Sequence, residues 1–159
     1  MRIYLKNGEN DIKKFAEKYT IVSVANEKLE FEFFSIDVRD FYIYVDDNVD
    51  DKVERIEKII NFIKREGIET TKIILSDSYF YFKKKISSKE GLKKLEDIIK
   101  ESKIINKLLL KNVKINRFET YSNTIILDCE LDFDNFLMLF DFVKKILKEV
   151  EKIAMVEVI

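Results

Sequence analysis

The chain of 159 residues is 47% hydrophobic and 37% charged, and its 29 basic and 30 acidic side chains nearly cancel. The apolar fraction supports a buried core and argues against a wholly disordered chain, while the charge balance gives no reason to expect a strongly basic protein. The sequence has no histidine and three glycines, so it excludes histidine-based catalysis, imidazole metal sites and glycine-rich phosphate loops. We therefore expect a binding protein without a cofactor rather than an enzyme.

The sequence also predicts the compartment. No apolar run approaches the roughly 18–20 residues that a membrane span needs, and the start turns polar after Leu5, unlike the apolar segment of a signal peptide. Cys129 is the single cysteine, so an internal disulfide cannot form. We expect a cytoplasmic protein with no membrane partner. The many lysines and glutamates are also typical of a thermophile.

The first half of the chain alternates strand and helix patterns. Residues 2–5 alternate as a strand, and Asn10 is placed to cap a short helix over 11–18. Three β-rich runs follow, and an apolar stripe with helical spacing then predicts a helix over about 50–66, which Gly67 ends. The three runs and the strand after Gly67 have the sequences TIVSVAN, KLEFEFFSIDV, DFYIYVD and TKIIL.

The second half restarts with a strand pattern, SYFYFKKKI. Ser87 and Glu90 have the spacing of a capping box, which predicts a helix from there to about residue 110. The remaining predicted elements are a two-stranded hairpin around Ser122-Asn123, a helix over about 134–152 and a closing strand, MVEVI.

The hydrophobic patterns of the two halves match at one constant offset. Ile43 falls on Leu127, Asp50 falls on Asp134, and the sequence KIIL of the first half falls on VEVI at the end of the second. Two interpretations fit this match. One is a tandem duplication, and the other is a strand-helix-strand pattern that unrelated segments share.

Each half has roughly the order β-α-β-β-α-β, with an extra strand in the first. This order predicts an α+β fold with helices on one face of a mostly antiparallel sheet. We expect the halves, residues 1–76 and 77–159, to form one compact unit, as one curved sheet or as two ferredoxin-like parts. The element order resembles duplicated saddle folds such as that of the TATA-binding protein. No motif residue accompanies this likeness, so it implies no function.

Four aspartates lie between a predicted strand and a predicted helix, at Asp46, Asp47, Asp50 and Asp51. Mg²⁺ or Ca²⁺ needs several oxygen ligands that converge on one point, and this stretch lacks the central glycine of an EF-hand loop. The favoured interpretation is helix capping, because aspartate accepts backbone N–H bonds and its charge complements the helix dipole. A metal-dependent enzyme built on these carboxylates is the alternative.

A second candidate site combines aromatic and basic residues in one run. Its members are Tyr79, Tyr81, Lys83, Lys84 and Lys85. Aromatic rings on a sheet can stack on bases while lysines neutralise phosphates. Alternating aromatics are also ordinary strand residues, and lysines often protect the end of a strand. Nucleic-acid binding through this run therefore stands as an alternative function.

The last predicted helix carries apolar residues on more than one face. The members expected to contact a partner are Phe136, Met138, Leu139, Phe140 and Phe142. Aromatic residues and methionine are typical of protein interfaces, although most of this helix is expected to be buried within the fold. Cys129 is interpreted as a buried structural residue rather than a nucleophile.

These observations favour a non-catalytic cytoplasmic protein that acts through protein–protein association. The expected form is a homodimer, through the last helix or through an exposed edge strand. The two alternatives are the nucleic-acid-binding module and the carboxylate-based metal-dependent enzyme.

Overall fold

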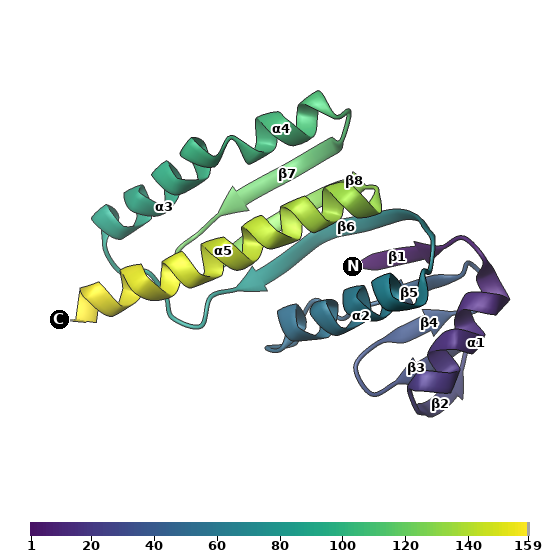
Figure 1. The fold of residues 1–159 in the computed structure, drawn as a ribbon. Coiled ribbons are helices and arrows are strands. Elements are labelled where there is room, and N and C mark those ends of the chain that lie inside the picture. The colour runs from purple at the N-terminus through teal and green to yellow at the C-terminus, as the bar shows by residue number, and fades with distance from the viewer. Residues whose placement is uncertain (159) are drawn as a thin grey trace. The chain divides into compact units, whose positions relative to one another are not determined.

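The computed structural model describes residues 1–158 and shows an α+β protein (Figure 1). Within these residues, eight strands form a sheet in the order β2-β3-β4-β5-β1-β6-β8-β7. The strands are β1 Arg2–Leu5, β2 Ile21–Ala25, β3 Lys28–Phe31, β4 Ser35–Asp37, β5 Tyr42–Tyr44, β6 Thr70–Tyr81, β7 Lys114–Thr120 and β8 Thr124–Leu131. The helices are α1 Gly8–Lys18, α2 Lys52–Glu66, α3 Lys89–Ser102, α4 Ile104–Leu110 and α5 Phe133–Val158. The predicted α+β class with an antiparallel sheet is confirmed, whereas ferredoxin-like halves are not shown.

The chain divides into two compact units, which we call the first unit (Met1–Leu75) and the second unit (Ser76–Ile159). The boundary lies inside β6 rather than in a loop. The part of β6 before the boundary pairs with β1, antiparallel, from Thr70 to Ile74.

A row of isoleucines forms the core of the first unit. Ile3 on β1 lies directly opposite Ile43 on β5 and Ile73 on β6, and Ile43 also lies opposite Ile36 on β4. All four side chains are fully buried. Side chains of a strand alternate between faces, so this register places the intervening residues of the same strands on the other face.

The helices of the first unit meet in an aromatic cluster. Phe15 on α1 packs on Phe62 of α2 at 4.6 Å between ring centroids and on Phe34 at 5.5 Å. Gly67 ends α2 in the left-handed conformation (φ 64°), and its N–H donates to the carbonyls of Ile63 and Lys64, as the sequence predicts. The predicted N-terminal cap of the first helix, Asn10, is wrong, because α1 begins at Gly8, directly after Asn7.

A tight turn of two residues joins β2 to β3. Both residues have positive φ, 50° at Asn26 and 63° at Glu27, which is the type I′ geometry that suits the twist of a hairpin. Asparagine tolerates this conformation, whereas glutamate pays a steric cost there.

Replacing Glu27 with glycine is therefore expected to raise the free energy of unfolding by about 1 kcal/mol. The exposed ion pair between Glu27 and Arg39 would be lost, but exposed pairs contribute little. Urea denaturation measures the change. Glu27→Ala is the matched control, because it removes the same carboxylate and keeps a Cβ. Equal effects of the two substitutions would contradict the explanation through positive φ.

The second unit contains the antiparallel hairpin β7–β8, which confirms the hairpin predicted around Ser122-Asn123, and α5 contacts it. In register, Phe118 on β7 lies opposite Leu127 on β8, and the Phe118 ring contacts Phe142 of α5 at 6.3 Å. The thiol of Cys129 is buried on β8. Burial raises the pKa of this thiol to about 12, so it stays protonated and inert near neutral pH.

The start of α3 is fixed by the end of α5. Ser88 caps α3 by accepting a hydrogen bond from the Gly91 N–H at 2.9 Å. The Glu157 carboxylate accepts from the N–H groups of Ser87 and Ser88, at 2.8 and 3.1 Å, and from the Ser88 hydroxyl. A Cβ on Gly91 would clash with Glu157 Oε1 and would lie 2.7 Å from Ile86 Cγ2 and 2.9 Å from Ile153 Cγ2, which explains a glycine within a helix. Ser88, with Glu157 of another helix, thus replaces the predicted capping box of Ser87 and Glu90.

Three predicted boundaries in the second half are wrong. The predicted strand TKIIL and the first four residues of SYFYFKKKI belong to one strand, β6, which ends at Tyr81, because no turn-forming glycine or proline separates them. The predicted helix to residue 110 breaks at Lys103, which has positive φ (55°) between α3 and α4. The predicted closing strand MVEVI is helical as far as Val158, and Ile159 lies outside the described residues. The expected match of VEVI with KIIL therefore fails.

Candidate functional site

The most exposed apolar feature of the first unit is the edge strand β2. All five of its residues are exposed, and Val22 and Val24 are 59% and 70% exposed. β2 pairs with β3 on one side and lies at the end of the strand order, so no strand among residues 1–158 covers its other side. β2 also carries no charge, which leaves a free row of backbone donors and acceptors flanked by apolar side chains.

The opposite end of the strand order, β7, differs in composition. Lys114, Arg117 and Glu119 place charges along this strand, and Arg117 holds both Asp77 at 3.3 Å and Glu119 at 3.0 Å. Charged side chains are the usual protection of a free edge, because a pairing chain would have to desolvate them. Of these two edge strands, β2 is therefore the one that can pair with a further strand, because it carries no charged side chains.

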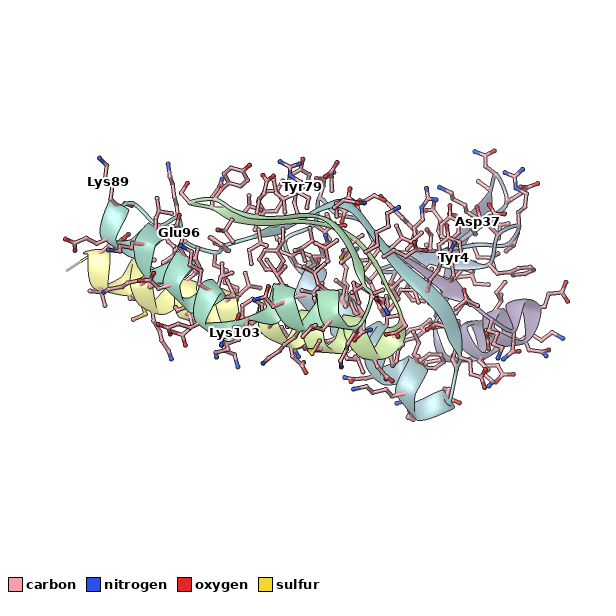
Figure 2. All side chains as sticks on the ribbon, turned by 90° about the horizontal axis from the view of Figure 1, so that it is seen from above. Tyr4, Asp37, Tyr79, Lys89, Glu96 and Lys103 are labelled. Atoms are coloured by element: carbon pink, nitrogen blue, oxygen red, sulfur yellow. The ribbon has the colours of Figure 1, made fainter. Side chains whose placement is uncertain are left out.

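The outer face of the first unit's strands carries a different chemistry, with tyrosines beside cations. Figure 2 shows Tyr4 and Asp37 on the side away from α1 and α2. Tyr4 packs on Tyr42 at 5.2 Å. Lys72 lies 4.8 Å from the Tyr4 ring and Arg2 lies 4.7 Å from the Tyr42 ring, distances typical of cation–π contacts.

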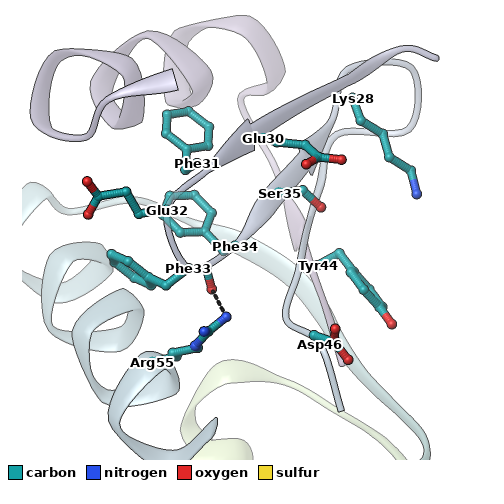
Figure 3. Close-up of a pocket in the computed structure, with 10 residues that line it drawn as sticks. All are labelled: Lys28, Glu30, Phe31, Glu32, Phe33, Phe34, Ser35, Tyr44, Asp46 and Arg55. Carbon is teal, nitrogen blue, oxygen red and sulfur yellow. Dashed lines mark hydrogen bonds between the residues drawn. The ribbon is translucent and has the colours of Figure 1, made fainter. Parts of the chain in front are cut away.

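A shallow concavity adjoins this face. It has a volume of about 250 Å³, and Lys28, Glu30, Phe31, Glu32, Phe33, Phe34, Ser35, Tyr44, Asp46 and Arg55 line it (Figure 3). Arg55 crosses to the β3–β4 connection and donates from Nη1 to the Phe33 carbonyl at 3.5 Å. Burial, followed by the nearby Asp47 and Asp46 charges, raises the pKa of Tyr44, so its ring stays neutral. The concavity thus combines an aromatic wall with charges of both signs.

Asp37 closes the connection between β4 and β5. Its Oδ1 accepts from the N–H groups of Asp40 and Arg39, at 2.8 and 2.9 Å. The hydrogen bond from the Asp40 N–H lowers the pKa of the Asp37 carboxyl below its ordinary value of 3.8. Burial opposes this shift, and the hydrogen bond from the Arg39 N–H adds to it. The ionised form is therefore the one that stabilises this loop.

We expect this carboxylate to contribute to acid unfolding. Between the lowered pKa and 3.8 the unfolded chain binds more protons at this position than the folded chain, so the free energy of unfolding falls as the pH falls through that window. Asp37→Asn should flatten this part of the stability profile, measured by urea denaturation from neutral to acid pH. Asp40→Asn, at an exposed neighbour, is the control. An unchanged profile in Asp37→Asn would contradict the assignment.

The structure separates the four aspartates predicted as caps or ligands. Asp47 binds the buried Lys52 ammonium and lies 3.5 Å from the Met1 ammonium, while Asp51 pairs with Arg55 at 2.8 Å. Asp46 accepts from the Asn48 N–H. Asp51 is the residue before α2 but makes no side-chain capping bond, so the predicted cap is wrong there.

At the strand-to-helix junction of the second half, an aspartate does cap the helix. The Asp132 carboxylate accepts from the Asn135 N–H at 2.8 Å at the start of α5. Asp50 is exposed. Within the described part of the chain, no three carboxylate or thiol groups converge as ligands of a metal ion.

The predicted nucleic-acid residues lie in the second unit. Tyr79 and Tyr81 stack at 6.1 Å between ring centroids, and Tyr81 is half exposed. Lys83, Lys84 and Lys85 are exposed in the segment after β6, and Lys83 lies 3.9 Å from Glu151. The structure therefore brings the two tyrosines together and leaves the lysines at the surface.

The residues predicted to contact a partner on the last helix are mostly inside the protein. Phe136, Leu139, Phe140 and Phe142 are buried, and Met138 is half-buried. These four side chains fill the core of the fold and leave little surface for a second protein. None of the site residues predicted from the sequence lies on β2. Its sequence, IVSVA, nevertheless has the pattern of an uncharged strand with apolar residues on both faces.

No helix among residues 1–158 is both long and apolar enough to cross a bilayer. No protein-family model, no curated protein and no solved structure matches the chain, so its function has to be inferred from the surfaces described above.

Proposed function

We propose that this protein acts by self-association, with β2 of one copy pairing antiparallel with β2 of a second copy. The observation that carries the proposal is that all five residues of β2 are exposed, uncharged and at the end of the strand order. Strand pairing would satisfy the free backbone groups, and a two-fold axis would make the contact self-complementary. We expect no catalysis from this surface.

The side chains of β2 favour a second copy as the partner. Ile21 lies opposite Phe31 and Val24 lies opposite Leu29, two positions apart on β3, so Ile21 and Val24 share one face of the strand. An antiparallel pair brings these apolar residues of both copies together. A charged partner segment would find no complementary charge on β2. The strand is short, and its register with β3 shifts between Ile21 and Ser23, so the expected dimer is weak and depends on concentration.

Sedimentation velocity at rising protein concentration tests the proposal. The unmodified protein should shift from monomer to dimer, and Val24→Lys should stay monomeric, because a lysine on a free edge prevents pairing. Leu110→Lys is the matched control, since Leu110 on α4 is 85% exposed and lies outside the first unit. A strict monomer at the highest concentration, or equal loss of the dimer in both variants, would overturn the proposal.

A further inference from the structure

We propose that the outer face of the first unit's strands, together with the concavity beside Tyr44, binds single-stranded nucleic acid. This surface is separate from the free edge of β2 and does not depend on self-association. It also differs from the run Tyr79–Lys85, which lies in the second unit.

The register of the strands assembles the surface. One row across neighbouring strands consists of Lys72, Tyr4, Tyr42, Asp37 and Lys28. The next row consists of Ile74, Arg2, Tyr44, Ser35 and Glu30. Tyrosines therefore lie at the centre of this face, with cations beside them. The residues come from five strands and are distant in sequence, which explains why no run in the sequence predicts the surface.

Each tyrosine of this surface has a cation at its ring. Lys72 lies 4.8 Å from Tyr4, Arg2 lies 4.7 Å from Tyr42, and Lys28 lies 6.0 Å from Tyr44. Single-stranded nucleic acid presents alternating bases and phosphates, and proteins bind it by stacking bases on aromatic rings while cations track the backbone. Tyr42 is buried, so Tyr4 and Tyr44, which are half-buried, offer the ring surface for stacking.

The concavity gives the surface a site for one base. Its volume of about 250 Å³ lies below the roughly 300–1,000 Å³ of pockets for larger ligands, and it shares Tyr44 and Lys28 with the tyrosine face (Figure 3). Glu30 and Asp46 place carboxylates on its lining, and a carboxylate accepts hydrogen bonds and donates none. Cytosine, adenine and guanine each carry an amino group that can donate to such carboxylates, whereas thymine offers only its ring N3–H. The site should therefore favour a base with an amino group over thymine.

The charges of the surface limit its affinity. Arg2, Lys28 and Lys72 can contact phosphates, whereas Glu30 and Asp46 repel them. Asp37 adds negative charge, although its carboxylate is occupied by two backbone N–H groups. With at most three phosphate contacts, we expect weak binding. The logarithm of the binding constant should fall linearly with the logarithm of the salt concentration, with a slope of about −2.

Fluorescence anisotropy with labelled oligocytidine and oligothymidine DNA in low salt tests the proposal. The unmodified protein should bind oligocytidine more tightly than oligothymidine. Tyr44→Ala should weaken binding about tenfold by removing a stacking ring, and Tyr44→Phe should restore it. Tyr81→Ala is the matched control, because it removes a half-exposed tyrosine of the second unit.

Three results would overturn the proposal: no binding by the unmodified protein, equal binding of the two oligonucleotides, or loss in Tyr81→Ala without loss in Tyr44→Ala. Circular dichroism of Tyr44→Ala shows whether the variant is folded, and the double variant Arg2→Ala/Lys28→Ala gives a second test if it is not. That variant should bind more weakly and show a shallower dependence on salt. An unchanged salt dependence would also count against the site.

Discussion

Replacing Asp47 with alanine is expected to lower the free energy of unfolding by about 3 kcal/mol. The Asp47 carboxylate binds the Lys52 ammonium and lies 3.5 Å from the Met1 ammonium. Both ammonium groups are buried, and burial lowers the pKa of each below its ordinary value. Without Asp47, two buried positive charges would lose an opposite charge next to them, and such a loss is strongly destabilising. Urea denaturation at neutral pH measures the change.

Two variants show whether the effect comes from the buried charges. Lys52→Met keeps the apolar stem and removes one ammonium, so its effect should be far smaller than that of Asp47→Ala and can be stabilising. Asp46→Ala, at the exposed neighbour, should change the free energy of unfolding by less than about 1 kcal/mol. If Asp47→Ala is as mild as Asp46→Ala, the buried ion pair does not stabilise the first unit.

The second large effect is expected from Ile43→Ala, at about 4 kcal/mol of destabilisation. Ile43 is fully buried and lies between Ile3 and Ile36 on the two neighbouring strands. Alanine would leave a cavity beneath the strands, and strands can move together only slightly without losing their hydrogen bonds. Thermal and urea unfolding followed by circular dichroism measure the loss.

Ile43→Val is the graded control for this position. It removes one methyl group and keeps the β-branched shape, so the expected loss is about 1 kcal/mol. A similar loss in the two variants would show that the site collapses around the smaller residue. A loss below about 1 kcal/mol in Ile43→Ala would contradict the central place of the isoleucine row in the core.

The sequence predicts the strong local patterns of this fold. The strand of residues 2–5, the helix that ends at Gly67 and the hairpin around Ser122-Asn123 are all present. Each has a signal that neighbouring residues determine: alternation, a left-handed cap, or a polar turn between apolar runs. The α+β class follows because strands come in consecutive runs, such as β2 to β5, with helices before and after them.

One error, at the end of the chain, lies where two segments distant in sequence meet. The end of α5 stays helical where the β-branched residues of MVEVI favour a strand, and there Glu157 binds the start of α3. The interpretation of the two halves as a tandem duplication also loses support at MVEVI, because the end of α5 stands where the duplication predicts a strand.

The candidate sites show the same division between local and distant signals. The four aspartates form a cluster in the sequence, but their carboxylates find separate partners: Asp47 a buried lysine and Asp51 an arginine one helical turn away. The tyrosine face shows the opposite case, because Arg2, Tyr44 and Lys72 lie far apart in sequence and meet through strand register. Neither result follows from local sequence pattern.

The position of β6 has a consequence for any attempt to divide the protein. Cutting the chain between Leu75 and Ser76 would sever a strand that serves both units: Ile74 pairs with β1, and the Phe80 carbonyl accepts from the Thr124 hydroxyl. The fragment that ends at Leu75 and the fragment that starts at Ser76 would each contain only part of β6. Fragments designed as single units should therefore each keep residues 70–81.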